Sequence, residues 1–290
     1  MQLLTDHHQS LLPALYFVAT PIGAARDITL RGMDILKNAD VLAAEDTRNT
    51  RHLLDIHGIT LGGRPLIPYH DHNGAKQRPR LVSLIKEGKS VAYVSDAGTP
   101  LIADPGYALS RDVIAAGHKV IAAPGASALL AALAVAGLPT DQFFFAGFLP
   151  PKASARQKVL RGLAAVPGTL VFYESPKRVG KSLRDMVQEL GGNRPAALCR
   201  ELTKKFEEVR RETLEDLAAI YAEDAPRGEV VLVVGQGPER DVGPELLDGA
   251  LMSALRENDT LRDAVDLVAE ALNMPRKLVY RRALELEKGR

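Results

Sequence analysis

The chain has 290 residues, of which 46% are hydrophobic and 25% charged, and its net charge of +1 gives no overall field that would attract nucleic acid. Its length allows two domains with cores of their own, and its single cysteine, Cys199, excludes an internal disulfide and a cysteine metal cluster. No apolar run approaches the roughly 18 residues of a membrane helix and no signal pattern opens the chain, so a cytoplasmic protein without a membrane segment is expected.

The first half of the chain alternates short apolar runs with helical patterns. Beyond a polar lead-in, residues 1–13, which we expect to be flexible, strands are predicted at 15–19, 41–44, 66–67, 91–94 and 119–123, and helices at 27–39, 77–87, 107–116 and 128–136. This alternation is typical of a parallel sheet, whose ligands lie beyond the carboxyl ends of the strands. Residues 14–136 are therefore predicted to form an α/β domain with a small-molecule site along one sheet edge.

The loop after the strand at 91–94 carries the strongest signal for a binding site. It reads Ser95-Asp96-Ala97-Gly98-Thr99-Pro100 and continues to residue 106. Its glycines permit positive φ and close backbone approach, and the Asp96 carboxylate can accept hydrogen bonds from a ribose or an amine. The alternative is a plain turn with a helix cap. A ligand is favoured, because loops after parallel strands so often carry sites.

Two further loops at the same predicted edge suit a ligand. Thr20-Pro21-Ile22-Gly23 leaves the first strand and is either a ligand wall or a simple strand exit. Ser127 is expected to cap the helix at 128–136, whose first amides suit a carboxylate or a polar edge. Neither loop is the G-x-G-x-x-G fingerprint, so a nucleotide-binding oxidoreductase is not favoured.

Charged side chains follow the second and third strands. Glu45-Asp46-Thr47-Arg48 can supply an acid, a base and an anion clamp; the alternative is a helix capped by Asp46 or Thr47, with Arg48 paired to Glu45. His70-Asp71-His72-Asn73 has a spacing that can bind metal, but no other convincing ligand is near in sequence. A loop that faces the substrate, or a solvated loop, is expected there instead.

The pattern restarts as a second α/β domain, predicted at residues 137–238. Its strands are expected at 143–148, 169–173, 196–199 and 230–234, its main helix at 176–190, and a capping box at Thr213 and Asp216. The stretch 150–161 carries no acidic residue and suits an RNA backbone. Its cations are Lys152, Arg156, Lys158 and Arg161.

The C-terminal extension, residues 239–290, is predicted to be helical. Its helices are expected at 245–256, 261–272 and 276–288, with a capping box at Thr260 and Asp263. A short turn before a basic last helix indicates a helix-turn-helix-like unit that contacts RNA; the alternative is a helical clasp with a solvated basic face. That helix carries Arg276, Lys277, Tyr280, Arg281 and Arg282.

Five segments of the chain occur together in one known family. They are the four motifs at 20–23, 44–48, 70–73 and 94–102, and Arg200-Glu201-Leu202-Thr203-Lys204; the segments 147–150 and 172–175 lie between them in the expected places. On these motifs the chain resembles the bacterial small-subunit rRNA cytidine 2′-O-methyltransferases of the tetrapyrrole methylase superfamily. The resemblance extends from Leu15 to the C-terminus.

The resemblance implies two α/β domains of the tetrapyrrole methylase type, a homodimer, and S-adenosylmethionine bound in the cleft between the domains. The cofactor-binding residues that it implies are Pro21, Ser95, Asp96, Ala97, Gly98, Thr99, Pro100, Ile102, Ser127, Ala128, Tyr173 and Leu202. The product would be a 2′-O-methylcytidine in the decoding region of 16S rRNA, with small-subunit rRNA or the 30S subunit as the partner.

Methyl transfer to a ribose requires the reacting atoms to be aligned and the hydroxyl proton to be removed, without a metal. The candidate groups are Glu45, Asp46 and His70, with Lys204 a weaker candidate, and Arg48 is expected to hold a flanking phosphate. The sequence leaves the choice of base open. The alternatives are a tetrapyrrole methyltransferase, which the basic tail argues against, and a non-catalytic ribosome-assembly factor, which the intact strand-end loops argue against.

Overall fold

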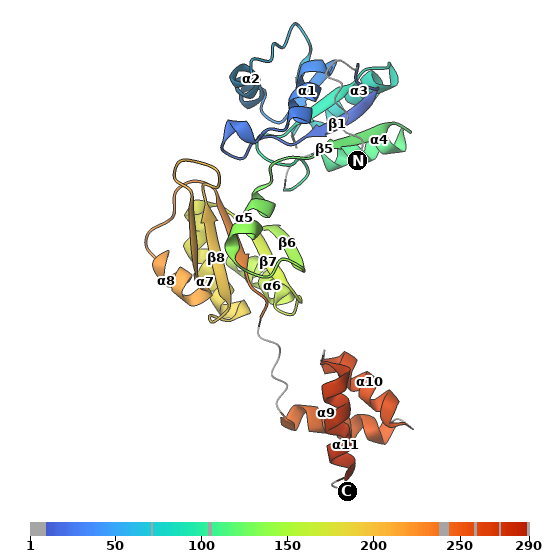
Figure 1. Ribbon diagram of the computed structural model, residues 1–290, viewed down its shortest axis with the longest axis vertical. Helices are drawn as coiled ribbons and strands as arrows, with labels where there is room; N and C mark the ends of the chain where they lie inside the picture. The colour runs from blue at the N-terminus through green and yellow to red at the C-terminus, as the bar shows by residue number, and fades with distance from the viewer. Residues whose placement is uncertain are drawn as a thin grey trace. The chain divides into compact units, whose positions relative to one another are not determined.

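The computed structural model describes residues 10–70, 72–103, 106–237, 244–257, 260–272 and 274–288 (Figure 1). It contains two five-stranded sheets with helices, and a helical C-terminal part, so the expected α/β class is confirmed. By their internal contacts, residues 1–237 and 238–290 form two compact units. The finer division into domains stays a prediction, and most of the expected flexible lead-in lies outside the described residues.

The N-terminal sheet is parallel throughout and has the strand order β3-β2-β4-β1-β5. Its strands are β1 (Ala14–Val18), β2 (Val41–Ala44), β3 (Leu66–Pro68), β4 (Val91–Val94) and β5 (Lys119–Ala123). Val94 is the register partner of both Val18 and Ala44, so the central strands end at the same level. The loops that leave them therefore meet along a single edge.

Helices connect these strands: α1 (Leu30–Asn38), α2 (Thr47–Ile56), α3 (Gly74–Lys86), α4 (Tyr107–Ala115) and α5 (Ala128–Ala136). The helix predicted from residue 27, with Asp27 as its cap, begins later than expected. Thr29 caps α1, because its hydroxyl accepts the Gly32 amide at 3.0 Å, and Asp27 instead ends the short 3-10 helix η1 (Ala25–Asp27).

The second sheet is mixed and has the order β6-β7-β10-β8-β9. Its strands are β6 (Phe143–Phe148), β7 (Thr169–Glu174), β8 (Pro195–Arg200), β9 (Glu208–Thr213) and β10 (Val230–Val234). Only β6 and β7 run parallel; the other neighbours are antiparallel. Its helices are α6 (Ala153–Leu163), η2 (Pro176–Arg178), α7 (Val179–Leu190) and α8 (Leu214–Ile220).

Helix α5 packs on the second sheet, against β8, β9 and β10. Its Leu129 and Leu133 lie in one apolar cluster with Ile22 from the β1 exit and with Ala197 and Val231 from the second sheet. The helix that the sequence assigns to the first domain is thus part of the core that joins the two sheets. This packing brings the edge of the N-terminal sheet close to residues of the second sheet.

Cys199 lies in β8 with no exposed surface, and burial raises the pKa of its thiol to about 11. Because the thiolate is the reactive form, we expect iodoacetamide at neutral pH to leave the folded protein unmodified and to alkylate it fully in concentrated guanidinium chloride. Mass spectrometry of the intact chain counts the added groups. Rapid alkylation of the native protein would show that β8 is not held in this core.

The C-terminal unit contains the three helices that the sequence predicts. They are α9 (Pro244–Glu257), α10 (Leu261–Leu272) and α11 (Arg276–Lys288), and they pack around Leu251, Val265 and Val279. The Thr260 hydroxyl accepts the Asp263 amide at 3.1 Å, as the capping box requires. No helix in the described part of the chain is long and apolar enough to span a membrane.

Candidate functional site

Loops from β1, β2 and β4 are joined by hydrogen bonds at the carboxyl edge of the N-terminal sheet. Thr20 and Gly98 each donate an amide to the other's carbonyl, both at 3.0 Å. The Glu45 amide donates to the Val94 carbonyl at 3.3 Å, and the buried Ser95 hydroxyl donates to the Gly98 carbonyl at 2.8 Å. The loop after β4 is therefore fixed against the exit of β1.

Several residues of this loop adopt the left-handed backbone conformation. Gly98 has a φ of +80°, and a Cβ placed on it would lie 3.2 Å from Ile22 Cγ2. Two residues that carry side chains, Leu101 at 74° and Ala103 at 59°, also have positive φ. Such conformations cost energy and occur most often at ligand sites and switches. This strain supports a binding role for the loop.

The amino terminus of α5 lies beside the same loop and beside β7. The Thr99 hydroxyl donates to the Ala126 carbonyl at 2.9 Å, and the Tyr173 hydroxyl accepts the Leu129 amide at 3.1 Å. Burial raises the pKa of Tyr173, so its phenol stays protonated. Residues from both sheets therefore line one region.

The residues proposed to bind a cofactor differ in their exposure. Buried ones are Ser95, Gly98, Pro100, Ser127 and Leu202; partly buried ones are Pro21, Thr99, Ile102, Ala128 and Tyr173; exposed ones are Asp96 and Ala97. Ile102, Ala128, Tyr173 and Leu202 belong to the apolar cluster that also holds Ile22. The structure thus brings together candidates that lie far apart in the sequence.

A second junction, which the sequence did not indicate, connects the exit of β1 to the loop after β8. The Ala24 amide donates to the Thr203 hydroxyl at 3.0 Å, and Thr203 has a φ of 63°. A Cβ on Gly23 would lie 2.7 Å from that hydroxyl and 3.0 Å from the Leu202 carbonyl oxygen. We call these residues, Gly23, Ala24, Leu202 and Thr203, the β1–β8 junction.

Lys204 lies next to this junction and is held by two carboxylates. Its ammonium donates to Glu201 at 3.0 Å and to Glu229 at 3.1 Å. Burial lowers the pKa of Lys204, but these hydrogen bonds outweigh it and raise the pKa above its usual value. The side chain is therefore protonated at neutral pH, which disfavours it as a base.

Asp46 caps α2 and is the partner of Arg48. Its carboxylate accepts the Arg48 amide at 2.8 Å and the Arg48 Nε at 3.1 Å, and its own amide donates to the Asp96 carboxylate at 3.0 Å. The cap that the alternative interpretation assigned to Asp46 is confirmed, but Arg48 pairs with Asp46 and not with Glu45. Hydrogen bonds from the Arg48 side chain and amide lower the pKa of Asp46 to about 2.

The other candidate bases are not joined to Asp46. His70 Nδ1 is buried and has no hydrogen-bond partner among the described residues, and the His70 ring lies 5.9 Å from that of His72. No hydrogen bond or ion pair of the Glu45 side chain occurs in the described parts of the chain. Asp71 lies outside those parts. Within them, no group of three acidic, histidine or cysteine side chains is arranged to hold a metal ion.

The basic stretch at 150–161 is less basic at its surface than expected. Arg156 is 4% exposed and donates to Asp185 at 2.6 Å, and Arg161 donates to Glu189 at 2.9 Å. The acids come from α7, which packs on α6. Because these pairs neutralise two of the four cations, Lys152 and Lys158 are, within the described part of the chain, the unpaired cations of this stretch.

Helix α11 divides its cations in a similar way. Arg276 pairs with Asp266 of α10, and Arg282 donates to Asp248 of α9 at 2.7 Å. Both pairs connect α11 to its neighbours. Lys277 and Arg281 are exposed and have no ion pair within the described residues. They are unpaired cations of this helix that a nucleic acid can reach.

Two family models match the chain. Residues 14–218 match the model described as Tetrapyrrole (Corrin/Porphyrin) Methylases, and residues 243–287 match the RsmI C-terminal HTH domain. The chain is 48% identical over 278 residues to the Ribosomal RNA small subunit methyltransferase I of Mesorhizobium japonicum, covering 96% of this chain and 93% of that protein. It is 45% identical to the protein of the same name from Vibrio cholerae, at 94% and 95% coverage.

Solved structures share the fold at low identity. The uroporphyrin-III-C-methyltransferase from Thermus thermophilus is 24% identical, with 77% of this chain and 94% of that chain covered and a TM-score of 0.54. A cobalt precorrin-4 methyltransferase is 19% identical, with coverage of 81% and 98% and a TM-score of 0.58. A Thermus thermophilus enzyme complexed with S-adenyl homocysteine is 21% identical, with coverage of 77% and 97% and a TM-score of 0.55.

Proposed function

The chain belongs to the tetrapyrrole methylase family, and from this premise we propose that it methylates the ribose 2′-hydroxyl of a cytidine in the decoding region of 16S rRNA, with S-adenosylmethionine as the donor. The observation that carries the proposal is the match of nearly the whole chain, helical unit included, to proteins named ribosomal RNA small subunit methyltransferase I. A tetrapyrrole substrate would leave the helical unit unexplained.

The strand-end loops have the chemistry that S-adenosylmethionine requires. Asp96 presents an exposed carboxylate to ribose hydroxyls or an ammonium, and the amino terminus of α5 offers backbone N–H groups to an anionic or polar edge. Gly98 permits the positive φ that the loop requires, and Ile102 and Leu202 supply apolar surface. When bound, this cofactor supplies an electrophilic methyl group.

Asp46 and Arg48 suit the positioning of the ribose. With a pKa of about 2 the Asp46 carboxylate stays ionised and is a weak proton acceptor, so we assign it to accept a hydrogen bond from the ribose and to orient it. Arg48, whose side chain is 86% exposed, can hold a flanking phosphate. Of the remaining candidate bases, His70 is favoured over Glu45 because its buried Nδ1 lacks a partner.

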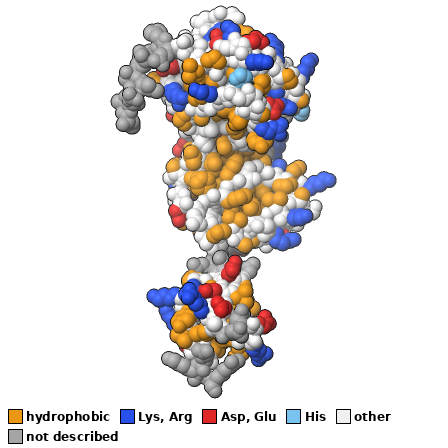
Figure 2. Space-filling model, turned by 90° about the vertical axis from the view of Figure 1, so that its right-hand side faces the viewer, with side chains coloured by type: hydrophobic (Ala, Val, Ile, Leu, Met, Phe, Trp, Pro, Cys, Tyr) orange, Lys and Arg blue, Asp and Glu red, His pale blue; other side chains and the backbone are white. Residues whose placement is uncertain are grey.

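We also propose that the protein works as a homodimer in the cytoplasm and acts on the 30S subunit. Exposed phenylalanines on β6 support the dimer: Phe143 and Phe144 are each 44% exposed and Phe148 is 56% exposed, and Leu130 on α5 is 56% exposed. Figure 2 shows a broad hydrophobic area over this part of the molecule. Apolar surface of this extent favours burial against another chain.

Charge reversal at Lys277 and Arg281 together is expected to weaken binding to small-subunit RNA and to lower the slope of log affinity against log salt by roughly 1.4, since each lost phosphate contact on a single strand removes about 0.7. Fluorescence anisotropy over a salt series measures both quantities. Charge reversal at the exposed Lys37 and Lys86 changes the net charge equally and serves as the control. Equal affinity and slope in the two variants would mean that α11 does not hold RNA.

The proposed reaction is tested by incubating the purified protein with labelled S-adenosylmethionine and small subunits that lack the modification. Label in 16S rRNA is the expected result. Tight cofactor binding by calorimetry, with no label in subunits or in free rRNA, would contradict the assignment of rRNA as the substrate. It would favour a tetrapyrrole substrate, or a non-catalytic assembly factor that binds the cofactor without transferring its methyl group.

A further inference from the structure

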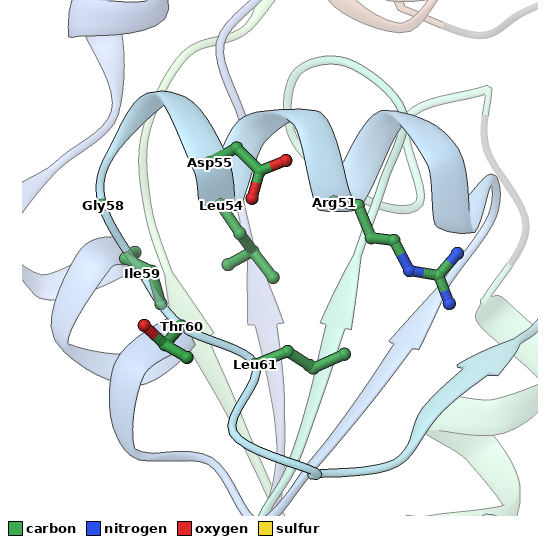
Figure 3. A pocket seen from close by; sticks show the side chains of 7 residues that line it. All are labelled: Arg51, Leu54, Asp55, Gly58, Ile59, Thr60 and Leu61. Carbon is green, nitrogen blue, oxygen red and sulfur yellow. The ribbon is translucent and has the colours of Figure 1, made fainter.

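A cavity of about 460 Å³ lies between the second half of α2 and the loop that follows it (Figure 3). It is lined by Arg51, Leu54, Asp55, Gly58, Ile59, Thr60 and Leu61. We propose that this cavity is a subsite for one guanine base of the RNA strand, a few nucleotides from the ribose that is methylated. The inference rests on the proposed function and names a part of the substrate that the strand-end loops do not bind.

The size and floor of the cavity suit a flat aromatic ring. Its volume lies within the range of roughly 300 to 1,000 Å³ that small-molecule sites occupy. Leu54, 2% exposed, points from α2 toward the loop, and Ile59, 5% exposed, and Leu61 come from the loop itself (Figure 3). Leu54 and Ile59 belong to the hydrophobic core beneath the cavity, so the groups that can contact a base are the side chains at its rim. Proteins that read single-stranded RNA stack unstacked bases on aromatic rings or on Arg guanidinium planes, and Arg51 offers such a plane at this rim.

The rim of the cavity carries one cation and one anion that are not paired with each other. Arg51 and Asp55 lie one turn apart on α2, and both are exposed. Neither side chain has a hydrogen bond or an ion pair within the described residues. An ion pair between positions i and i+4 of a helix is weaker when the cation comes first, as Arg51 does here. Both groups are therefore free to bind a ligand.

Guanine matches this pair of side chains better than the other bases do. Its N1–H and N2–H groups are adjacent donors that both oxygens of the Asp55 carboxylate can accept, and its O6 and N7 are acceptors for the planar Arg51 fork. Adenine, cytosine and uracil do not combine two donors on neighbouring ring atoms with two acceptors on the adjoining edge of the base. The charged rim therefore selects guanine.

Helix α2 connects this cavity to the proposed ribose site. Asp46 caps the helix, and Asp55 lies nine residues further on, which corresponds to about 14 Å along the axis. A stacked strand advances about 3.4 Å per nucleotide, so the guanine lies about four stacked nucleotides from the target, or fewer if the strand is extended. A rigid helix with a base site at one end and the ribose site at the other would fix which nucleotide is methylated.

The test is a titration of the isotopically labelled protein with guanosine 5′-monophosphate, followed by the backbone amide signals of residues 58–61 in NMR spectra. Those signals are expected to shift, and inosine 5′-monophosphate, which lacks the 2-amino group, is expected to bind about tenfold more weakly. Asp55→Asn should remove the preference for the guanine nucleotide, and Arg51→Gln should weaken binding of both nucleotides. The exposed Asp224→Asn and Arg184→Gln serve as controls.

Shifts that spare residues 58–61, or equal binding of the guanosine, inosine and adenosine monophosphates, would overturn the inference. Methyl transfer to small subunits is measured separately on the same preparations. Full transfer by the wild-type protein without these shifts contradicts the guanine subsite alone. Guanine-dependent shifts without any methyl transfer contradict the proposed reaction and support the subsite.

Discussion

Replacement of Asp46 by alanine is expected to lower the rate of methyl transfer by about 10²-fold, the loss that a misplaced reacting group causes. The affinity for S-adenosylmethionine is expected to stay within about twofold, because Asp46 meets the cofactor loop through its backbone amide, which alanine keeps. Single-turnover kinetics with small subunits and calorimetry with the cofactor measure the two effects separately.

Asp46 also caps α2, so the variant needs a control for stability. Loss of an N-cap costs about 1 kcal/mol. Asp46→Ser keeps a hydroxyl that can cap the helix but removes the carboxylate, and we expect it to be as inactive as the alanine variant. Full activity of the serine variant would reduce the role of Asp46 to capping.

The pH dependence separates Asp46 from the other candidate groups. Its pKa falls from the ordinary 3.8 to about 2, so the pair with Arg48 favours the folded state above pH 3.8, and this contribution is lost as the pH falls from 3.8 to about 2. The turnover rate should therefore show no inflection from Asp46 near neutral pH. If His70 is the base, His70→Gln lowers the turnover rate and leaves the affinity for S-adenosylmethionine unchanged.

The second large effect is expected at Gly98. Gly98→Val places a β-branched side chain at a φ of +80°, with its Cβ 3.2 Å from Ile22, in a residue whose amide and carbonyl both bond to Thr20. We expect at least a tenfold loss of affinity for S-adenosylmethionine, measured by calorimetry, because strain of 1 to 3 kcal/mol falls on the loop itself.

Gly88 offers a matched control for this substitution. It has a φ of +88°, and a side chain there would meet nothing within 4 Å. Gly88→Val carries the same backbone strain in a turn before β4, so it should lower the melting temperature without a comparable loss of cofactor affinity. Equal losses of affinity in both variants would mean that the loop after β4 does not form the cofactor site.

The sequence predicted most strands, because their cores are continuous apolar runs such as those of β4 and β10. It missed β9, which reads Glu-Val-Arg-Arg-Glu-Thr and has one strongly apolar residue in six. β9 forms because it pairs along its full length with β8 at the edge of the sheet. A strand that depends on such a partner and buries none of its side chains fully has no clear signal of its own.

The sequence predicted those parts of the candidate site whose position follows from the parallel direction of the strands. Parallel strands bring their exits to one edge, which is why the loops at Ser95 and Asp46 could be placed together. The β1–β8 junction could not be predicted, because it joins residues that are close only after the two sheets pack. The pairing of Lys204 with Glu229 could not be predicted either, because it depends on β8 lying beside β10 in the second sheet. Arg156 could not be assigned from sequence because its partner Asp185 comes close only when α7 packs on α6.

The measurement that tests the central claim most directly is a map of the methyl group on 16S rRNA. Small subunits from a strain without the enzyme are incubated with the protein and S-adenosylmethionine, and nuclease fragments are analysed by mass spectrometry. The expected result is one added methyl group on the ribose of a single cytidine in the decoding region. A methyl group on a base, scattered methylation, or none on subunits or free rRNA would contradict the account.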